Sequence, residues 1–305
     1  MCERHCDTRW FLEWNLACYV KQIINSDQSV MATSLTTRQQ LEQNGFCIVP
    51  LVSETEAQEW KKHVKRLESQ RQGVTIDPST KSTVDPADTG INVWMTETGD
   101  FPTFFLQKLA NKKLRQCVEA FFPCTEHAAP SRTPSVQPVI ELLSCKPVSK
   151  SKKVAHPSPW HQDWVYWFGA PKVSAWIALD NATIDNGCLR VIPGSHKFGL
   201  VPHEQFQERI GFDRRIPDDV VESLCQKHQC TVVDVPIPAG HAIIFSDLLL
   251  HSSNANVTGA DRYSLIPTYR DQAAKDESRV WKCGASFSAE TDAFVVPALH
   301  QQAKL

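Results

Sequence analysis

Residues 174–194 read S-A-W-I-A-L-D-N-A-T-I-D-N-G-C-L-R-V-I-P-G, and they indicate the architecture more clearly than other parts of the chain. Two β-type runs, Ser174–Leu179 and Cys188–Ile192, flank Asn186-Gly187, a dipeptide that favours the tight turns of β-hairpins. Pro193-Gly194 supplies another turn signal directly after the second run. The segment therefore predicts short strands joined by turns.

Similar short runs alternate with turn residues from residue 139 onward. Besides the two runs above, the predicted strands are Val139–Leu143, Trp160–Phe168, Thr231–Val235, His241–Phe245, Leu248–Ser252 and Tyr263–Thr268. About eight short strands with this punctuation favour a sandwich or barrel of the jelly-roll type, the double-stranded β-helix of cupin-like proteins.

The part of the chain before residue 139 is predicted to be mainly helical. Gly45 ends one short helix, and Ser53 with Glu56 forms a capping box that begins a second, amphipathic helix. The stretches 71–100 and 124–138 lack periodicity and are predicted to be mostly loops. The predicted elements are the helices Thr36–Asn44, Ser53–Leu67 and Asn111–Phe121 and the strand Phe46–Pro50. We therefore expect an α+β fold in which N-terminal helices pack on a jelly-roll core.

Length and composition indicate one large domain with two appendages. The chain has 305 residues, of which 42% are hydrophobic and 22% charged, so it can bury a core. Residues 1–33 are interpreted as an N-terminal extension, residues 34–300 as the domain and residues 301–305 as a tail.

Charge and cysteine content argue against several classes of protein. The formal net charge of −2 gives no electrostatic reason to bind nucleic acid or an anionic membrane. No apolar run reaches the roughly 18 residues of a membrane span. The N-terminus lacks the pattern of a secretion signal. Eleven cysteines, an odd number, favour reduced thiols in an intracellular protein.

The motif with the clearest chemistry is His161-Gln162-Asp163, which falls inside the predicted strand Trp160–Phe168. Residues i and i+2 of a strand point to the same face, roughly 7 Å apart, so His161 and Asp163 could bind one metal. His251 ends an apolar run and could supply a third ligand from another strand. Two histidines and one carboxylate are the ligand set of non-haem Fe(II) oxygenases, in which three coordination positions stay open.

An arginine that could bind a carboxylate follows His251 in the sequence. Arg262 lies eleven residues after His251, at the start of the next predicted strand. Its guanidinium could grip a carboxylate bidentately, which suits the distal carboxylate of 2-oxoglutarate.

Each of these signals is weak when taken alone. A second H-x-D copy, His5-Cys6-Asp7, has no strand context and is interpreted as chance. A single histidine such as His251 could equally be a core residue. Cys225, His228 and Cys230 resemble part of a metal site but lack a second pair, which argues against zinc there. The combination of H-x-D, distant histidine and arginine is what favours the iron site.

The chain resembles the phytanoyl-CoA dioxygenase family of Fe(II)/2-oxoglutarate oxygenases over about residues 36–270. The similarity is densest from Lys146 to Lys197, in K-P-V-S-K-S-K-K-V-A-H-P-S-P-W-H-Q-D and A-W-I-A-L-D-N-A-T-I-D-N-G-C-L-R-V-I-P-G-S-H-K. It continues in G-x-A-I-I-F, L-L-L-H-S-S and Arg262, and near residue 44 in N-G-F-x-I-V.

This resemblance implies a role for individual residues. The implied iron ligands are His161, Asp163 and His251, and the implied residues of the 2-oxoglutarate site are Arg262, Ser253, Trp176 and Leu142. Leu142 stands where the family usually has methionine. The family often has a lysine that contacts 2-oxoglutarate, but the matching position, near Trp94 or Met95, holds no lysine. The co-substrate is therefore held differently, or the loops align differently.

The resemblance also implies the reaction. We expect Fe(II), with 2-oxoglutarate and O2 as co-substrates and ascorbate in support, to hydroxylate an unactivated C–H bond. The first expected substrate is a 2-methyl-branched fatty acyl-CoA, hydroxylated at its α-carbon, and the second is a small natural product. Asp163 argues against halogenation, because halogenating relatives lose that carboxylate.

Two other classes stay open at this point. A jelly roll can be a non-enzymatic binding protein, because fold alone does not fix function. Two histidines and a carboxylate can also bind zinc in a hydrolase. Intact ligands argue against the first class, and Arg262 and Ser253 would have no role in the second.

Two further features bear on substrate and location. Lys146, Lys150, Lys152 and Lys153 are expected to form a solvated loop, or alternatively a site for the phosphates of a coenzyme A thioester. Ala303-Lys304-Leu305 differs by one small residue from the peroxisomal S-K-L signal. Together with the resemblance, this tail predicts a peroxisomal enzyme that an import receptor recognises, with the cytoplasm as the alternative.

Overall fold

The computed structural model describes residues 35–70, 75–76, 83–84, 91–93, 103–122, 138–152, 156–206, 212–274, 285–287 and 294–295. The extension 1–33, with its His5-Cys6-Asp7 copy, and the tail 301–305 lie outside these residues. Trp94, Met95 and Lys153 also lie outside them.

The predicted N-terminal helices are confirmed. Helix α2, Thr37–Asn44, begins at the capping residue Thr36 and ends at Gly45, whose φ of 79° is a left-handed conformation that glycine adopts easily. Helix α3, Glu54–Gln70, begins with the predicted capping box, in which the Ser53 backbone N–H donates to Glu56 Oε2 over 3.0 Å. Helix α6, Lys112–Phe121, is capped by Asn111. The helices α5, Thr103–Leu109, and α8, Asp218–His228, were not predicted.

Eight strands form a large antiparallel sheet. Its order is β1 (Phe46–Pro50), β12 (His241–Ser246), β7 (Lys172–Ala178), β14 (Arg262–Asp271), β5 (Ile140–Lys150), β15 (Ala285–Phe287) and β16 (Phe294–Val295), and β4 (Ile91–Val93) also pairs with β5. Strand β5 pairs with β14 along its length, so it extends seven residues beyond the predicted end at Leu143.

A four-stranded antiparallel sheet forms the second layer. Its order is β11 (Val233–Val235), β8 (Leu189–Val191), β13 (His251–Ser253) and β6 (Ser158–His161). The remaining elements are the pairs β2 (Thr75–Ile76) with β3 (Thr83–Val84) and β9 (Glu204–Gln205) with β10 (Arg214–Arg215), the short helix α7 (Trp164–Trp167) and the 3-10 helix Ser195–Phe198. Two facing antiparallel sheets confirm the predicted jelly-roll core.

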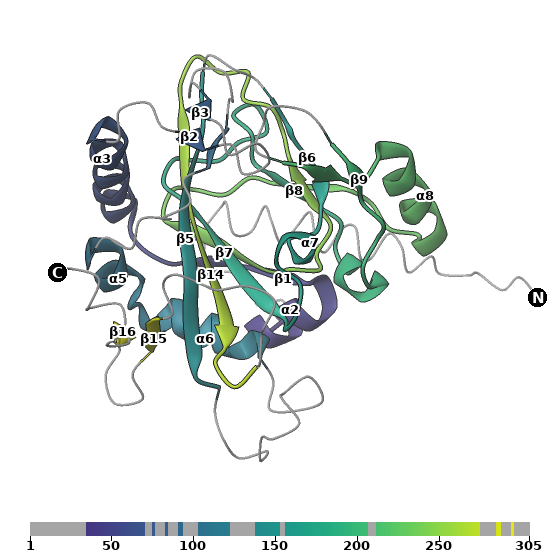
Figure 1. The fold of residues 1–305 in the computed structure, drawn as a ribbon, viewed down its shortest axis with the longest axis horizontal. Helices are drawn as coiled ribbons and strands as arrows, with labels where there is room; N and C mark the ends of the chain where they lie inside the picture. The colour runs from purple at the N-terminus through teal and green to yellow at the C-terminus, as the bar shows by residue number, and fades with distance from the viewer. Residues whose placement is uncertain are drawn as a thin grey trace, which may run out of the picture.

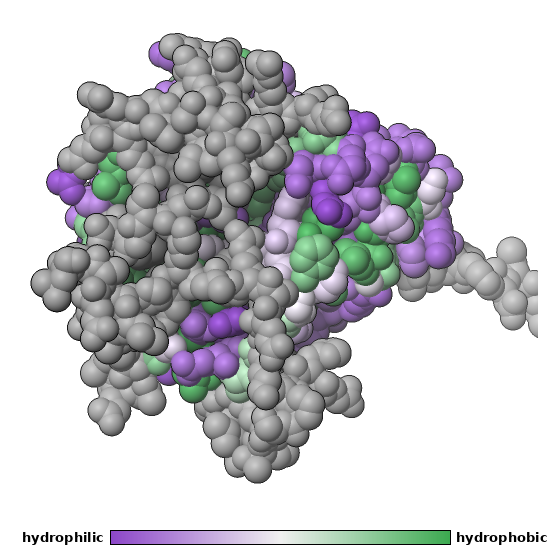
Figure 2. Space-filling view, in the orientation of Figure 1, coloured by the Kyte–Doolittle hydropathy of each residue, from purple (hydrophilic) through white to green (hydrophobic). Residues whose placement is uncertain are grey.

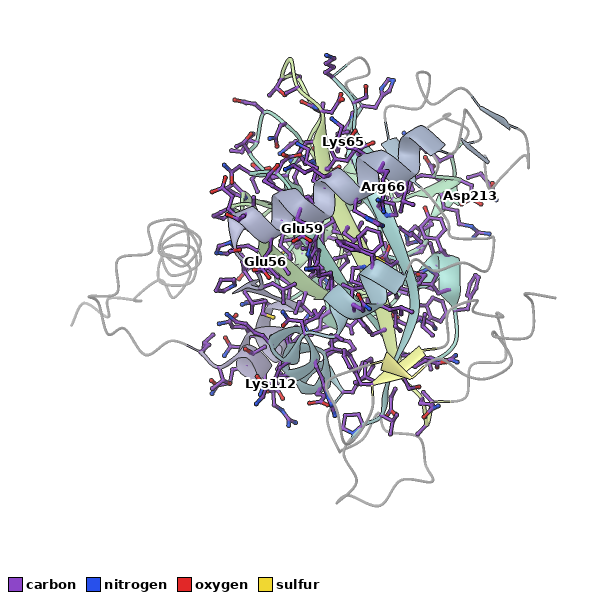
Figure 3. The ribbon with its side chains drawn as sticks, turned by 90° about the vertical axis from the view of Figure 1, so that its left-hand side faces the viewer. Glu56, Glu59, Lys65, Arg66, Lys112 and Asp213 are labelled. Atoms are coloured by element: carbon purple, nitrogen blue, oxygen red, sulfur yellow. The ribbon has the colours of Figure 1, made fainter. Side chains whose placement is uncertain are left out.

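The core has two main parts, one on each face of the large sheet. Between the sheets pack Trp176, Val191, Ile243 and Phe245. On the opposite face, the helices cover a second cluster that includes Trp60, Leu114 and Ile177. Figure 1 shows α3 and α5 on one side of the long strands β5, β7 and β14, and β6, β8 and α8 on the other. Figure 3 shows α3, with the labelled Glu56, Glu59, Lys65 and Arg66, running across the face of these strands.

The predicted strand Trp160–Phe168 is wrong beyond His161. Strand β6 ends there, and the next residues turn into α7. The Trp164 N–H donates to Asp247 O over 3.0 Å, and the Phe168 N–H donates to Trp164 O over 2.8 Å. Because aromatic residues favour strands, local propensity predicted the wrong conformation, and tertiary contacts override it here. No helix among the described residues is long and apolar enough to cross a membrane.

Candidate metal centre

The structure brings His161, Asp163 and His251 together between the sheets. His161 ends β6 and His251 begins β13, and the two are direct partners in that antiparallel pair. The potential ligand atoms of all three residues lie within 4.8 Å of one another. The Asp163 Oδ1 atom lies 3.6 Å from His161 Nε2 and 3.9 Å from His251 Nε2. Within the described part of the chain, this is the one group of three or more such side chains that could hold a metal.

Asp163 reaches the cluster by a route that strand geometry did not predict. It stands directly before α7 with φ −60° and ψ −28°, which is helical rather than extended backbone. The turn after β6 folds its carboxylate back toward His161. The spacing of the motif is therefore that of a strand end followed by a helix start, not that of two residues on one strand face.

Gln162, between the two ligands, holds this turn in place. Its side chain is fully buried, and its Nε2 donates to Gly199 O over 2.9 Å and to Leu248 O over 2.8 Å. Its Oε1 accepts from the Val201 N–H over 2.8 Å, and its backbone N–H donates to His203 Nε2 over 3.1 Å. The sequence analysis did not assign a role to Gln162. Its position as a polar residue inside a predicted apolar strand was the one signal that could have indicated this role.

Backbone carbonyls orient both imidazoles. The Nδ1 atom of His161 lies 2.8 Å from Pro159 O, and the Nδ1 atom of His251 lies 2.9 Å from Leu249 O. Donation from Nδ1–H leaves the Nε2 lone pair of each ring facing Asp163. Metal-binding histidines are held in the same way.

The site is electrostatically suited to a divalent cation. Burial raises the pKa of Asp163, but the neighbouring His161, His251 and Lys146 outweigh it and lower that pKa to about 2. Burial and the charge of His161 lower the pKa of His251 to about 4. An ionised carboxylate and a neutral imidazole are the forms that bind a metal. The three residues therefore fit the single-negative ligand set of Fe(II).

Arg262, the first residue of β14, is a buried cation. It is 2% exposed, and its Cζ lies 4.9 Å from the centroid of the Trp176 ring on β7. Its Nη1 donates to Ser264 Oγ over 3.0 Å and its Nη2 donates to Gly187 O over 3.1 Å. Its Nε has no hydrogen-bond partner in the described part of the chain.

No described carboxylate forms an ion pair with Arg262. Burial lowers its pKa to about 10, against the opposing effects of Cys188 and Asp180. Asp180 is already paired with Lys61, at 2.5 Å between Nζ and Oδ1. Burying an uncompensated charge costs several kcal/mol, so the site favours a ligand that brings a carboxylate.

The other residues expected in the co-substrate site lie in different places. Ser253 is 3% exposed in β13, where its Oγ donates to Ser158 Oγ over 2.7 Å. Trp176 is 3% exposed and stacks against Arg262. Leu142 does not join them, because it packs into the helix-side core with Ile140. A register shift between Thr268 and Tyr269 alters which face the start of β5 presents.

The lysine run is not the solvated loop that was expected. Lys146 and Lys150 belong to β5, and Lys150 is only 2% exposed. Its Nζ donates to Asn254 O and, over 3.0 Å, to His156 O. Lys152 is exposed. Buried as it is, Lys150 is unavailable to the phosphates of coenzyme A.

Known proteins resemble the chain in sequence. The profile of the phytanoyl-CoA dioxygenase family (PhyH) matches residues 41–264. Bovine peroxisomal phytanoyl-CoA dioxygenase is 24% identical over 272 residues, which cover 84% of this chain and 74% of the bovine protein. An L-proline trans-4-hydroxylase of Streptomyces griseoviridis is 34% identical over 131 residues, which cover 36% of this chain and 47% of that enzyme.

Solved structures share the fold. The epimerase SnoN, in complex with Fe3+, alpha ketoglutarate and nogalamycin RO, superposes with a TM-score of 0.56 at 16% identity and covers 84% of each chain. EvdO2 from Micromonospora carbonacea var. aurantiaca, complexed with 2-oxoglutarate, gives a TM-score of 0.55 at 20% identity over 82% of this chain and 96% of that one.

The family profile spans most of the domain and contains all three members of the His-Asp-His cluster as well as Arg262. The residues of the site and the match of the profile thus lead to one conclusion. The chain belongs to the phytanoyl-CoA dioxygenase family and is a 2-oxoglutarate-dependent non-haem oxygenase.

Proposed function

We propose that this enzyme uses Fe(II) and 2-oxoglutarate to hydroxylate the α-carbon of a branched fatty acyl-CoA. The observation that supports it best is the pairing of the His161–Asp163–His251 cluster with Arg262, a buried cation without an anionic partner among the described residues. A zinc hydrolase would have no use for that cation. A binding protein would have no reason to keep three ligands with oriented imidazoles.

The residues have distinct tasks in this reaction. His161, Asp163 and His251 hold the metal, and Arg262 binds the distal carboxylate of 2-oxoglutarate against the Trp176 ring. Bound Fe(II) and 2-oxoglutarate supply O2 activation and the oxidation of the C–H bond, with succinate and CO2 as products. Burial of the site excludes water from the reacting groups.

The surroundings of His161 suit an apolar substrate. The ring of Phe212 lies 4.7 Å from the His161 ring, and that of Tyr166 lies 6.0 Å from it, centroid to centroid. Phe168, at the end of α7, is 45% exposed. Figure 2 shows hydrophobic residues next to hydrophilic ones on the part of the surface where α7 and α8 lie. An alkyl chain could pack on these aromatic rings next to the metal, and the bovine relative supports an acyl-CoA.

Lys146 favours a second candidate, a small substrate that carries a carboxylate. Its charge helps to lower the pKa of Asp163, and its Nζ lies 5.7 Å from the centroid of the Trp167 ring. A cation at that place could bind a substrate carboxylate close to the metal. The proline hydroxylase among the relatives acts on a molecule of this kind.

A substrate screen tests both candidates. The protein is supplied with Fe(II), 2-oxoglutarate, ascorbate and O2, and succinate release is measured with branched acyl-CoAs, the free acids and small amino acids. The proposal expects succinate in proportion to substrate, and a product heavier by one oxygen atom. If acyl-CoAs give no product and an amino acid does, the second candidate replaces the first. If no compound stimulates succinate release above background, the proposed substrate classes are both wrong.

The proposed location is the peroxisomal matrix. Ala303-Lys304-Leu305 fits the small, basic and leucine positions of the receptor-read signal, and the bovine and human relatives are named as peroxisomal. A fluorescent protein fused to the N-terminus should colocalise with a peroxisome marker and become diffuse when Leu305 is deleted. A diffuse signal from both fusions would favour the cytoplasm.

A further inference from the structure

Lys150 and Arg262 place two buried cations side by side. Lys150 ends β5, Arg262 begins β14, and the two residues are direct partners in the antiparallel pair. Each is 2% exposed. The described residues contain no carboxylate within ion-pair distance of either side chain. Two buried basic groups without a carboxylate partner indicate that an anion completes this part of the site.

The contacts of Lys150 reach the same segments that surround Arg262. Its Nζ donates to Asn254 O, directly after Ser253, and to His156 O, two residues before Ser158. Its side chain passes Gly187, whose φ is +92° and where an added Cβ would overlap with Lys150 Cδ. Since Gly187 O also accepts a hydrogen bond from Arg262, both cations contact Gly187.

We propose that Lys150 is a positioning residue of the 2-oxoglutarate site, where it fixes the backbone around Arg262 and adds a second positive charge that the bound co-substrate keeps protonated. This inference rests on the proposed use of 2-oxoglutarate.

Its hydrogen bonds allow Lys150 to exist in both protonation states. A neutral amine has two N–H donors, which is the number that the carbonyls of His156 and Asn254 require. An ammonium has a third donor. No described residue accepts a hydrogen bond from that third donor, so a small anion bound next to Arg262 would be its acceptor.

The charges around Lys150 place its titration near neutrality. Burial, followed by the charge of Arg262, lowers its pKa to about 7. Burial raises the pKa of the Cys188 thiol to about 11, so the thiol is neutral. Asp180 and Asp234 lie further out, and each is already paired, with Lys61 and Arg190 respectively.

An anion bound here must raise the pKa of Lys150. Below pH 6 the side chain is already protonated, so binding takes up almost no proton. At pH 8 the free side chain is mostly neutral, and binding takes up as much as about 0.9 proton. Affinity for 2-oxoglutarate must therefore fall as pH rises above 7, by on the order of tenfold between pH 6.5 and 8.5.

Calorimetry measures this proton directly. The Fe(II)-loaded protein is titrated anaerobically with 2-oxoglutarate at pH 6 and pH 8, in buffers that differ in ionisation enthalpy. We expect uptake of most of one proton at pH 8 and little at pH 6. Lys150→Met should bind several-fold more weakly at pH 6 and lose the uptake at pH 8. Lys152→Met, the exposed neighbour in the same run, should behave as wild type.

The outcomes separate this inference from the proposed function. Binding by the wild type without proton uptake at pH 8, or uptake that persists in Lys150→Met, overturns the role of Lys150 alone. The number of protons taken up by the wild type tests the role of Lys150 even if the variant fails to fold. Absence of 2-oxoglutarate binding to the wild type at both pH values contradicts the proposed function itself.

Discussion

The guanidinium of Arg262 stacks on the indole ring of Trp176, with Cζ 4.9 Å from the ring centroid, and neither residue is more than 3% exposed. The two belong to neighbouring strands of the large sheet, β14 and β7. This contact and the hydrogen bonds to Ser264 and Gly187 hold the guanidinium in place, and its Nε has no partner among the described residues.

Loss of Arg262 should selectively weaken the binding of 2-oxoglutarate. Truncating one partner of a buried charge pair costs about 2–5 kcal/mol, so Arg262→Gln should raise the KM for 2-oxoglutarate by on the order of 30-fold or more. Steady-state succinate release measures this change. Arg215→Gln, which breaks a pair between exposed residues at 2.7 Å from Glu204, is the control and should leave that KM unchanged. An unchanged KM in Arg262→Gln would mean that another residue holds the co-substrate.

Loss of Gln162 should loosen the metal site and the fold together. Gln162→Ala leaves the Val201 N–H and the carbonyls of Gly199 and Leu248 without their partner in a buried position. Each such group costs about 1–3 kcal/mol, so the apparent Tm should fall by several degrees and Fe(II) affinity should drop. Thermal unfolding with and without Fe(II) measures both effects. Gln226→Ala, at an exposed position of α8, should match wild type. Equal Tm values for the two variants would show that Gln162 does not hold the turn.

Substitution of Gly187 should damage the co-substrate site by a clash as well as by strain. Its φ is +92°, and a Cβ would overlap with Lys150 Cδ and lie 2.7 Å from Asn254 O. Gly199 has φ +74° with nothing within 4 Å of an added Cβ, so Gly199→Ala reports the strain alone. That strain is about 1–3 kcal/mol. Gly187→Ala should therefore lower the free energy of unfolding more than Gly199→Ala, and it alone should raise the Kd for 2-oxoglutarate. Denaturant unfolding and ligand titration compare the two variants. Equal effects would show that the clash at Gly187 does not matter.

Much of the site was predictable from the sequence because its residues stand at chemically specific spacings. The sequence predicts the H-x-D motif, His251 and Arg262 as site residues, and the structure brings His161, Asp163 and His251 together. The sequence pattern also predicts three of the helices and most of the strands. The details that failed depend on long-range contacts. The conformation of Asp163 follows from a hydrogen bond between Trp164 and Asp247, which lie far apart in the sequence.

Lys150 is a second residue whose conformation depends on long-range contacts that a single sequence does not reveal. Its neighbours are serine, lysine and proline, which favour a loop. Pairing with ten residues of β14 extends β5 through this polar stretch and buries the lysine. Leu142 fails for a related reason, since a register shift in that pair is invisible in a single sequence.

The most direct test of the metal centre is Fe(II) binding by anaerobic equilibrium dialysis, with Asp163→Ala compared with wild type. The wild type should bind one Fe(II) per chain, and Asp163→Ala should bind much more weakly, because it keeps two neutral imidazoles and loses the single anionic ligand. Asp7→Ala, in the second H-x-D copy, should bind as the wild type does. Tight stoichiometric binding by Asp163→Ala, or loss of binding in Asp7→Ala, would contradict the assignment of His161, Asp163 and His251 as the iron ligands.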